Sequence, residues 1–234
     1  MAGRPLNVGG FTPFTATDYP GRLAGVVFVQ GCAWRCGYCH NPHLQARPRH
    51  SPLDWREVLT VLERRSGLLD AVVFSGGEPT TDLALPQAMR AVRALGFKVG
   101  LHTACLYPDR LRAVLPLVDW VGFDVKAQFD RYDEVTGVPG SGVPARAAVA
   151  AIVASGIASE CRTTVHPASL APDALLALAG ELASLGVRHW VIQQFRATGC
   201  ADDRLRVAGA AQYPSDTLLA ALRGRFGDVT LRRA

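Results

Sequence analysis

Short apolar runs alternate with amphipathic segments along most of this chain, and this alternation restricts the possible folds more than any other feature. Six of the runs are rich in Val, Phe and Ile and show little two-residue alternation, which is typical of strands covered on both faces. They span residues 25–30, 71–75, 97–101, 117–123, 159–165 and 187–193. This pattern predicts an α/β protein with a parallel sheet.

Segments with helical periodicity fill the intervals between these runs. Apolar residues recur at i, i+3, i+4 and i+7 in residues 55–62, 85–92 and 175–182. Asp54 and Asp82 precede two of these segments, and we expect them to cap the helices. Residues 214–226 and 229–231 are a candidate last helix and a candidate short strand.

Six strand–helix units in a row imply right-handed crossovers. Six is two units short of a closed eightfold barrel, so a curved, open partial barrel fits the length, and a flat doubly wound sheet is the alternative. No repeat, linker or low-complexity stretch interrupts the pattern. We therefore expect a single domain over residues 1–234.

The composition excludes several classes of protein. Hydrophobic residues make up 49% of the chain and charged residues only 19%, which excludes wholesale disorder. No apolar run approaches the ~18 residues of a membrane helix, and residues 1–10 lack the layout of a secretory signal. The net charge of +5 is scattered and forms no nucleic-acid motif. We expect a cytoplasmic protein that binds neither membrane nor nucleic acid.

Three of the six cysteines lie close together in the sequence: Cys32, Cys36 and Cys39. Three thiolates in a short loop bind either a soft metal ion or three irons of a cubane cluster. For a zinc ion, His40 or His43 would be the fourth ligand, although structural zinc sites usually take their ligands in two spaced pairs. The isolated cysteines are expected to be core residues: Cys105, Cys161 and Cys200.

Polar and glycine residues gather where the predicted strands end, which is where the active residues of α/β proteins lie. Beyond the cysteine loop, these residues are Gly76, Gly77 and Glu78 after the second strand, Thr103 after the third, Asp124 and Lys126 after the fourth, and Arg162 on the fifth. Because parallel strands end at the same edge of a sheet, we expect these residues and the cysteines to form one site.

The spacing Cys32-x3-Cys36-x2-Cys39 resembles the signature of radical S-adenosylmethionine (SAM) enzymes, and Ser75-Gly76-Gly77-Glu78-Pro79 resembles the glycine-rich motif of that family. The resemblance implies an open partial (β/α)6 barrel of the radical SAM type, with one 4Fe–4S cluster on the three cysteines. By the same resemblance, the open iron of the cluster chelates SAM. Electron transfer then splits the sulfonium and releases a 5′-deoxyadenosyl radical.

The residues at the strand ends suit the binding of SAM, and eight are candidate contacts: Tyr38, Gly76, Gly77, Glu78, Thr103, Asp124, Lys126 and Arg162. The glycines would let backbone approach the ligand closely, and Glu78 would receive its ammonium or ribose end. Either Lys126 or Arg162 would pair with the carboxylate of SAM, although Arg162 could instead pair with Glu160. Asp124 would bond the ribose or orient Lys126, and Tyr38 would lie against the adenine.

Further stretches resemble the activating enzymes of glycyl radical enzymes, among them Asp18-Tyr19-Pro20-Gly21, Asp124-Val125-Lys126 and Arg162-Thr163-Thr164-Val165-His166-Pro167. The chain looks most like anaerobic ribonucleoside-triphosphate reductase activating proteins, over most of residues 9–200. This resemblance implies that the radical passes to a glycine of a partner enzyme. It also implies a reductant such as flavodoxin or ferredoxin.

Other partners and substrates remain open from the sequence. Pyruvate formate-lyase or another glycyl radical enzyme is an alternative protein partner. A small-molecule radical SAM enzyme, such as a 7-carboxy-7-deazaguanine synthase, is the alternative within the family. That group tends to place Asp and then Ser or Thr after the third cysteine, whereas this chain has His40 and Asn41 there.

Overall fold

A computed structural model describes residues 4–197, 200, 202–203, 205 and 213–233. Within them, eight strands form one sheet in the order β1 to β8, so each strand pairs with its neighbours in the sequence. β1 (Val8–Thr15) runs antiparallel to β2 (Ala24–Val29). The remaining pairs are parallel and involve β3 (Ala71–Gly76), β4 (Lys98–Thr103), β5 (Trp120–Asp124), β6 (Ala158–Val165), β7 (Trp190–Gln194) and β8 (Val229–Arg232).

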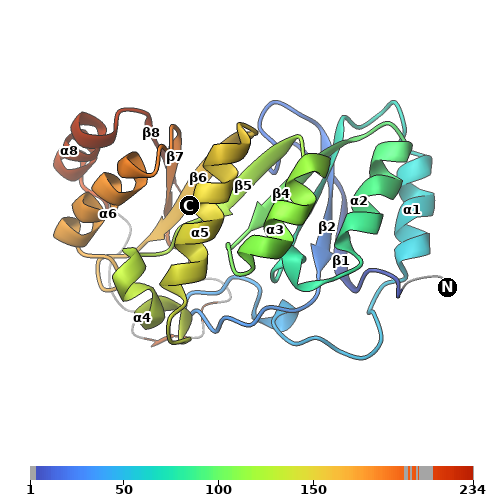
Figure 1. The fold of residues 1–234 in the computed structure, drawn as a ribbon, viewed down its shortest axis with the longest axis horizontal. Coiled ribbons are helices and arrows are strands. Elements are labelled where there is room, and N and C mark those ends of the chain that lie inside the picture. The colour runs from blue at the N-terminus through green and yellow to red at the C-terminus, as the bar shows by residue number, and fades with distance from the viewer. Residues whose placement is uncertain (1–3, 198–199, 201, 204, 206–212, 234) are drawn as a thin grey trace.

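The helices cover one side of this sheet, and in Figure 1 they lie in front of the strands. They are α1 (Trp55–Glu63), α2 (Leu85–Ala94), α3 (Pro108–Val114), α4 (Tyr132–Thr136), α5 (Gly142–Ser155), α6 (Pro172–Ser184) and α8 (Asp216–Phe226). A doubly wound sheet reverses its strand order and carries helices on both faces. Sequential strand order with crossovers of one hand places the helices on a single face of the sheet. The fold is therefore the predicted partial barrel, open because β1 and β8 do not pair with each other in the described residues.

The structure corrects two details of the sequence interpretation. β1 was not predicted, because Gly9, Gly10 and Pro13 are poor strand residues. They are tolerated here because β1 is an edge strand. Asp54 caps α1 as expected, by accepting a hydrogen bond from the Arg56 amide.

Asp82, by contrast, is not the N-cap of α2, where Ala84 takes that position. Its carboxylate instead accepts hydrogen bonds from the backbone amides of Ala84 and Asn7, at 3.0 and 2.9 Å. The turn before α2 is thereby joined to the segment that leads into β1.

The main core lies between the sheet and the helices, whereas the inner face of the sheet is filled only in part. Tyr19, from the β1–β2 loop, stacks on Trp120 with 5.1 Å between ring centroids. Gly100 makes room for it, because a Cβ there would lie 3.1 Å from the Tyr19 ring. This packing closes the inner face at Trp120, the first residue of β5. The remaining open space lies toward the C-terminal edge of the strands.

The three isolated cysteines are buried, as expected: Cys105, Cys161 and Cys200. Among the described residues, no helix is both long and apolar enough to cross a membrane.

Candidate functional site

The loop after β2 carries the three clustered cysteines, and its two ends are hydrogen-bonded to each other. The Gly31 and Cys32 amides donate to the carbonyls of Leu44 and Gln45, at 2.8 and 3.0 Å. The side-chain amide of Gln30 donates to two more carbonyls of the returning segment, at 2.9 and 2.7 Å. These bonds hold the loop along the C-terminal edge of the sheet, where it forms the blue segment at the lower side of Figure 1.

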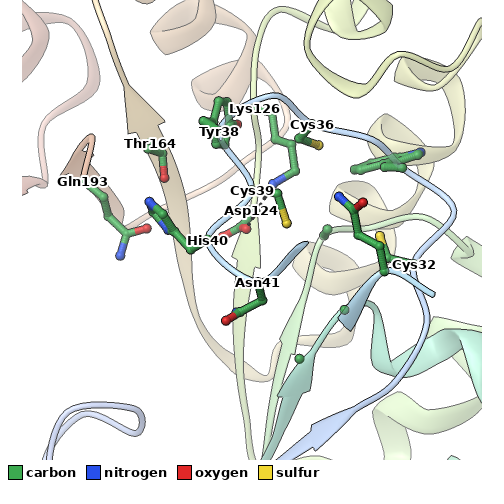
Figure 2. Close-up of a pocket in the computed structure, with 15 residues that line it drawn as sticks. Cys32, Cys36, Tyr38, Cys39, His40, Asn41, Asp124, Lys126, Thr164 and Gln193 are labelled. Atoms are coloured by element: carbon green, nitrogen blue, oxygen red, sulfur yellow. Dashed lines mark hydrogen bonds and ion pairs between the residues drawn. The ribbon is translucent and has the colours of Figure 1, made fainter. Parts of the chain in front are cut away.

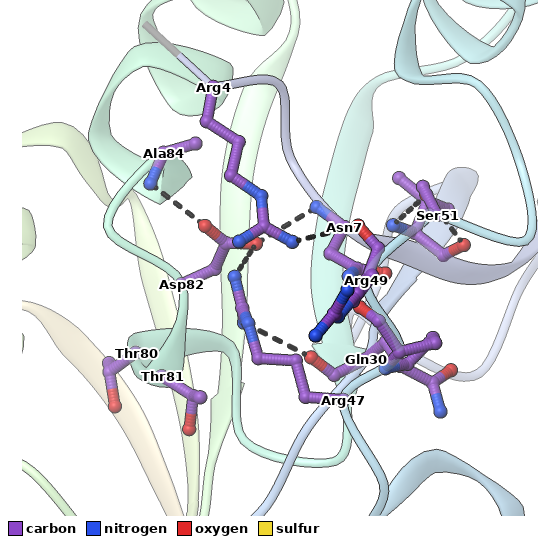
Figure 3. A network of polar contacts seen from close by, with 12 residues as sticks. Arg4, Asn7, Gln30, Arg47, Arg49, Ser51, Thr80, Thr81, Asp82 and Ala84 are labelled. Atoms are coloured by element: carbon purple, nitrogen blue, oxygen red, sulfur yellow. Dashed lines mark hydrogen bonds and ion pairs between the residues drawn. The ribbon is translucent and has the colours of Figure 1, made fainter.

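An ion pair between Arg47, which is exposed, and Asp82, which is buried, anchors the same loop, as Figure 3 shows. Arg47 contacts Asp82 at 2.8 Å and donates to the carbonyl of Gln30 at 3.3 Å. The Asp82 carboxylate also accepts the two backbone amides described above, so its buried charge is compensated. The pair joins the cysteine loop to the turn between β3 and α2.

One cavity lies between the cysteine loop and the C-terminal edge of the sheet, and Figure 2 shows side chains entering it from both. Eight of the eleven residues predicted for cluster and SAM line it: Cys32, Cys36, Tyr38, Cys39, Gly76, Gly77, Asp124 and Lys126. The other three do not: Glu78, Thr103 and Arg162. The predicted strand ends therefore meet at one place, although not every side chain points into it.

The three cysteines suit a cubane cluster because each supplies a thiolate to one of three irons, which leaves the fourth iron open. Burial raises the pKa of the Cys32 thiol to about 11 and also raises the pKa of Cys36, an effect that Lys126 partly offsets. Iron must therefore displace protons from these thiols when it binds. Within the described residues, no three His, Cys, Asp or Glu side chains meet closely enough to hold a single metal ion.

A charged pair stands on the sheet side of the cavity. Lys126 donates to Asp124 Oδ2 at 3.2 Å, and its Nζ lies 5.6 Å from the centre of the Tyr38 ring. Burial lowers the pKa of Lys126, but Tyr38, Asp124 and other neighbours outweigh it, so the pKa is well above its usual value. The ammonium is therefore charged at neutral pH. It can bind a ligand carboxylate, while Asp124 can accept from hydroxyl or ammonium groups.

Gly76 and Gly77 bring the end of β3 against the cysteine loop. A Cβ on Gly76, whose φ is +115°, would lie 2.5 Å from the Val29 carbonyl oxygen, and one on Gly77 would lie 2.4 Å from the Gly31 carbonyl oxygen. No side chain fits at either distance. The sequence suggested that these glycines let backbone approach a ligand. The structure shows that backbone of β2 and of the loop itself already requires them.

Glu78 is completely buried, and its carboxylate is surrounded by hydrogen-bond donors of the protein. It accepts from the Thr80 amide at 3.1 Å, the Thr103 hydroxyl at 2.9 Å and the Ala104 amide at 2.7 Å. Burial raises the pKa of Glu78, and the bonds from Thr80, Ala104 and Thr103 counteract this. Ala104 lines the cavity. Glu78 and Thr103 thus hold the ends of β3 and β4 together behind the cavity wall.

Arg162 lies deeper along the inner face of the sheet. Its Nε donates to Glu160 at 2.7 Å, the pairing that the sequence left open, and its guanidinium lies 5.2 Å from the centre of the Trp120 ring. Neighbouring His102 contacts the Asp18 carbonyl at 2.8 Å and the Ser75 hydroxyl at 3.3 Å. Burial, with Arg162 nearby, lowers the pKa of His102 to about 4, so this ring is neutral.

Several residues that line the cavity were not among the predicted contacts: Trp34, His40, Asn41, Gln45, Ala104, Thr164 and Gln193. Thr164 pairs in register with Gln193, and it lies two residues beyond Arg162 on the same face of β6. The polar alternation of Glu160, Arg162 and Thr164 could have revealed this face. For Trp34 and Gln45 no sequence signal exists, because their positions depend on the path of the loop.

Comparison with known proteins places this site in a family. The model of the Radical SAM superfamily matches residues 26–169. Among curated proteins, the chain is 28% identical over 210 residues to a protein of Methanocaldococcus jannaschii named as a glycyl-radical enzyme activating enzyme, covering 85% of this chain and 84% of that one. It is 38% identical over 129 residues to the pyruvate formate-lyase-activating enzyme of Clostridium pasteurianum, covering 51% and 52%.

Two further matches are a curated protein with another role in its name and a solved structure. A 7-carboxy-7-deazaguanine synthase of Methanopyrus kandleri is 31% identical over 151 residues, covering 53% of this chain and 59% of that one. The crystal structure of Streptococcus suis SuiB bound to S-adenosylmethionine has a TM-score of 0.64 at 13% identity, covering 88% of this chain and 48% of SuiB. That structural likeness shows the fold. The chain belongs to the radical SAM superfamily, whose enzymes use a 4Fe–4S cluster and S-adenosylmethionine.

Proposed function

We propose that this chain is an activase that cleaves SAM reductively and generates a glycyl radical on a partner enzyme, for which anaerobic ribonucleoside-triphosphate reductase is the first candidate. The similarity to a named activating enzyme over 85% of this chain and 84% of the relative carries the proposal. The match to a 7-carboxy-7-deazaguanine synthase covers only 53% of the chain. His40 and Asn41 after the third cysteine also favour the activase.

In this proposal Cys32, Cys36 and Cys39 hold the cluster, which when bound supplies the electron that splits the sulfonium of SAM. The residues of the chain bind and orient SAM. The Lys126 ammonium takes the carboxylate, and Asp124, whose side chain is 43% exposed, accepts from the ribose or the ammonium.

Other residues of the site have supporting roles. The backbone at Gly76 and Gly77 lines the cavity beside the cysteines and offers carbonyl acceptors to the ammonium of SAM. Tyr38 presents its ring to the Lys126 ammonium, 5.6 Å from the ring centre, and so favours the charged form of Lys126. Glu78, Thr103 and Arg162 support the residues that line the cavity, because their own polar groups are hydrogen-bonded within the protein.

A protein substrate suits the open sheet. A glycine radical is centred on a Cα that has no side chain, so an extended loop must bring that carbon to the cavity. Because β1 and β8 do not pair in the described residues, the barrel keeps a lateral side through which such a loop can enter. A bound loop would also exclude water from the radical, a task that many enzymes give to a lid.

The test is to incubate the cluster-loaded protein, reduced without oxygen, with SAM and anaerobic ribonucleoside-triphosphate reductase. Electron paramagnetic resonance should show a doublet, from coupling to the remaining Cα hydrogen, and the doublet should vanish when the target glycine of the reductase is replaced by Ala. If the doublet appeared on pyruvate formate-lyase instead, the chain would still be an activase, but its partner would be pyruvate formate-lyase. If no glycyl radical enzyme of the source organism acquires a radical while a small metabolite stimulates SAM cleavage, the small-molecule alternative is correct.

A further inference from the structure

A hollow of about 460 Å³ opens beside the base of the cysteine loop. Its lining includes Arg4, Arg47, Thr81, Leu83, Gln87 and Arg110. It shares no lining residue with the cavity between the cysteine loop and the sheet. The two are nevertheless close neighbours. A Cβ on Gly31 would lie 3.3 Å from Thr81 Cγ2 and 3.4 Å from Arg47 Cβ. The wall of the hollow therefore lies next to the residue that directly precedes Cys32.

Positive charge in this hollow is fixed in place and only partly compensated. Arg47 is paired with Asp82. Arg110 donates to the carbonyls of Thr80 and Thr81, at 3.3 and 3.0 Å, and Arg4 donates to the carbonyl of Arg49 at 3.3 Å. Among the described residues, no carboxylate forms an ion pair with Arg4 or Arg110. Backbone carbonyls orient these guanidinium groups without cancelling their charge.

An apolar side chain stands among these arginines. Leu83 is 77% exposed, more than any other large hydrophobic residue of the described chain. Arg110 is also held against the Tyr107 ring, 4.6 Å from its centre. Arginine and aromatic side chains are enriched at protein interfaces, where an apolar centre is surrounded by a polar rim. Figure 3 shows Arg4 and Arg47 approaching the same space beside Asp82.

We propose that this hollow is the docking site of an acidic one-electron donor protein, of the flavodoxin or ferredoxin class. The inference rests on the proposed function because reductive cleavage of SAM needs one electron from outside the protein. The donor is oxidised by one electron, the cluster held by the cysteine loop is reduced by one electron, and no atom or proton is transferred. Acidic side chains of the donor would pair with Arg4 and Arg110, and an apolar contact would cover Leu83.

The position of the hollow favours an electron donor over the glycyl radical enzyme. The cavity beside the cysteines must admit SAM and the target glycine, so a donor that used the same entrance would compete with both. The hollow is separate, yet Thr81 and Arg47 lie next to Gly31, one peptide from Cys32. Electron-transfer complexes typically have small interfaces steered by opposite charges. A small basic hollow beside the cluster loop suits such a complex.

Binding of purified flavodoxin to the cluster-loaded protein tests this proposal, by anaerobic calorimetry at low ionic strength. The double variant Arg4→Glu/Arg110→Glu should raise Kd at least tenfold and flatten its dependence on salt. Leu83→Ser, at a position too exposed to affect folding, should weaken binding several-fold. Both should retain iron and should cleave SAM at the unaltered rate with dithionite, a small reductant that needs no docking site.

The matched control is Arg146→Glu/Arg188→Glu, which changes net charge equally at exposed positions elsewhere on the protein. An unchanged Kd in the Arg4/Arg110 variant, or equal weakening in the control, would overturn the docking site. So would normal flavodoxin binding combined with lost glycyl radical formation under dithionite, since the hollow would then bind the substrate protein. Failure of the unaltered protein to cleave SAM with dithionite would refute the proposed function instead, and the measured Kd would still decide the docking site.

Discussion

Cysteine side chains of one chain can differ completely in role according to their surroundings. Cys32, Cys36 and Cys39 line the cavity, whereas Cys105 and Cys161 are buried in the main core. Replacing any one of the first three by Ala should abolish the four-iron content after anaerobic reconstitution, because an iron would lose its thiolate. Iron and sulfide analysis is the measurement. Cys105→Ala and Cys161→Ala are the controls and should retain iron, and any cavity cysteine that proves dispensable would remove that residue from the ligand set.

Glu78 belongs to a motif expected to contact SAM, yet its carboxylate bonds to Thr80, Thr103 and Ala104. Glu78→Gln would place a side-chain NH2 group, which donates hydrogen bonds, against groups that are themselves donors. We expect weaker SAM binding, by roughly 1–3 kcal/mol for one unsatisfied buried group, with normal iron content. Equilibrium dialysis with SAM and with methylthioadenosine, which lacks the amino-acid end, measures the effect.

The matched comparison for Glu78 is Lys126→Met. That variant should weaken binding of SAM but not of methylthioadenosine, because Lys126 acts on the carboxylate. Glu78→Gln should weaken binding of both ligands, since it displaces the cavity wall at Ala104. A Glu78→Gln protein that discriminated between the two ligands as Lys126→Met does would show direct contact between Glu78 and the amino-acid end of SAM.

Among the elements, β5 depends on a glycine for packing on the inner face of the sheet. A Cβ on Gly122 would lie 2.8 Å from Arg162 Cζ and 2.9 Å from the Trp120 ring. Gly122→Ala should therefore destabilise the protein by about 1–3 kcal/mol through overpacking. Gly180, inside α6, has open space around its Cβ position, and Gly180→Ala should stabilise by about 0.4–1 kcal/mol. Urea unfolding measures both effects. Equal unfolding midpoints for the two variants would contradict this explanation of the packing at Gly122.

For the whole molecule, His102 makes stability depend on pH, because its burial and the nearby Arg162 lower its pKa in the folded state. The ring joins the β1–β2 loop to β3 and β4. Its pKa falls from 6.5 to about 4 in the folded state. Above pH 6.5 its contribution is complete. As the pH falls from 6.5 toward 4, the unfolded chain takes up a proton that the folded chain refuses, so stability is lost.

His102→Gln should remove this part of the acid sensitivity, worth up to about 3 kcal/mol. Denaturant unfolding at pH 7 and pH 5 measures it: the variant should lose less stability than the unaltered protein between the two values. An identical loss in both proteins would show that His102 is not the group that responds.

The order of the elements and the place of the site could be predicted from the sequence, because both follow from local patterns. Apolar runs and helical periods reveal strands and helices wherever neighbouring residues decide the backbone. A parallel sheet with crossovers of one hand then brings the strand ends to one edge. This is why Cys32, Gly77, Asp124 and Lys126, on three separate segments, line one cavity as the sequence implied.

The direction of individual side chains was decided only by the tertiary structure. Glu78 finds its donors partly in Thr103 and Ala104, twenty-five and twenty-six positions away, and Asp82 finds Asn7 at a distance of seventy-five. A buried carboxylate turns toward whichever donors the fold places within hydrogen-bond reach, and motif spacing carries no record of them. The strand β1 likewise exists because β2 offers it an edge, against the preferences of its own glycines and proline.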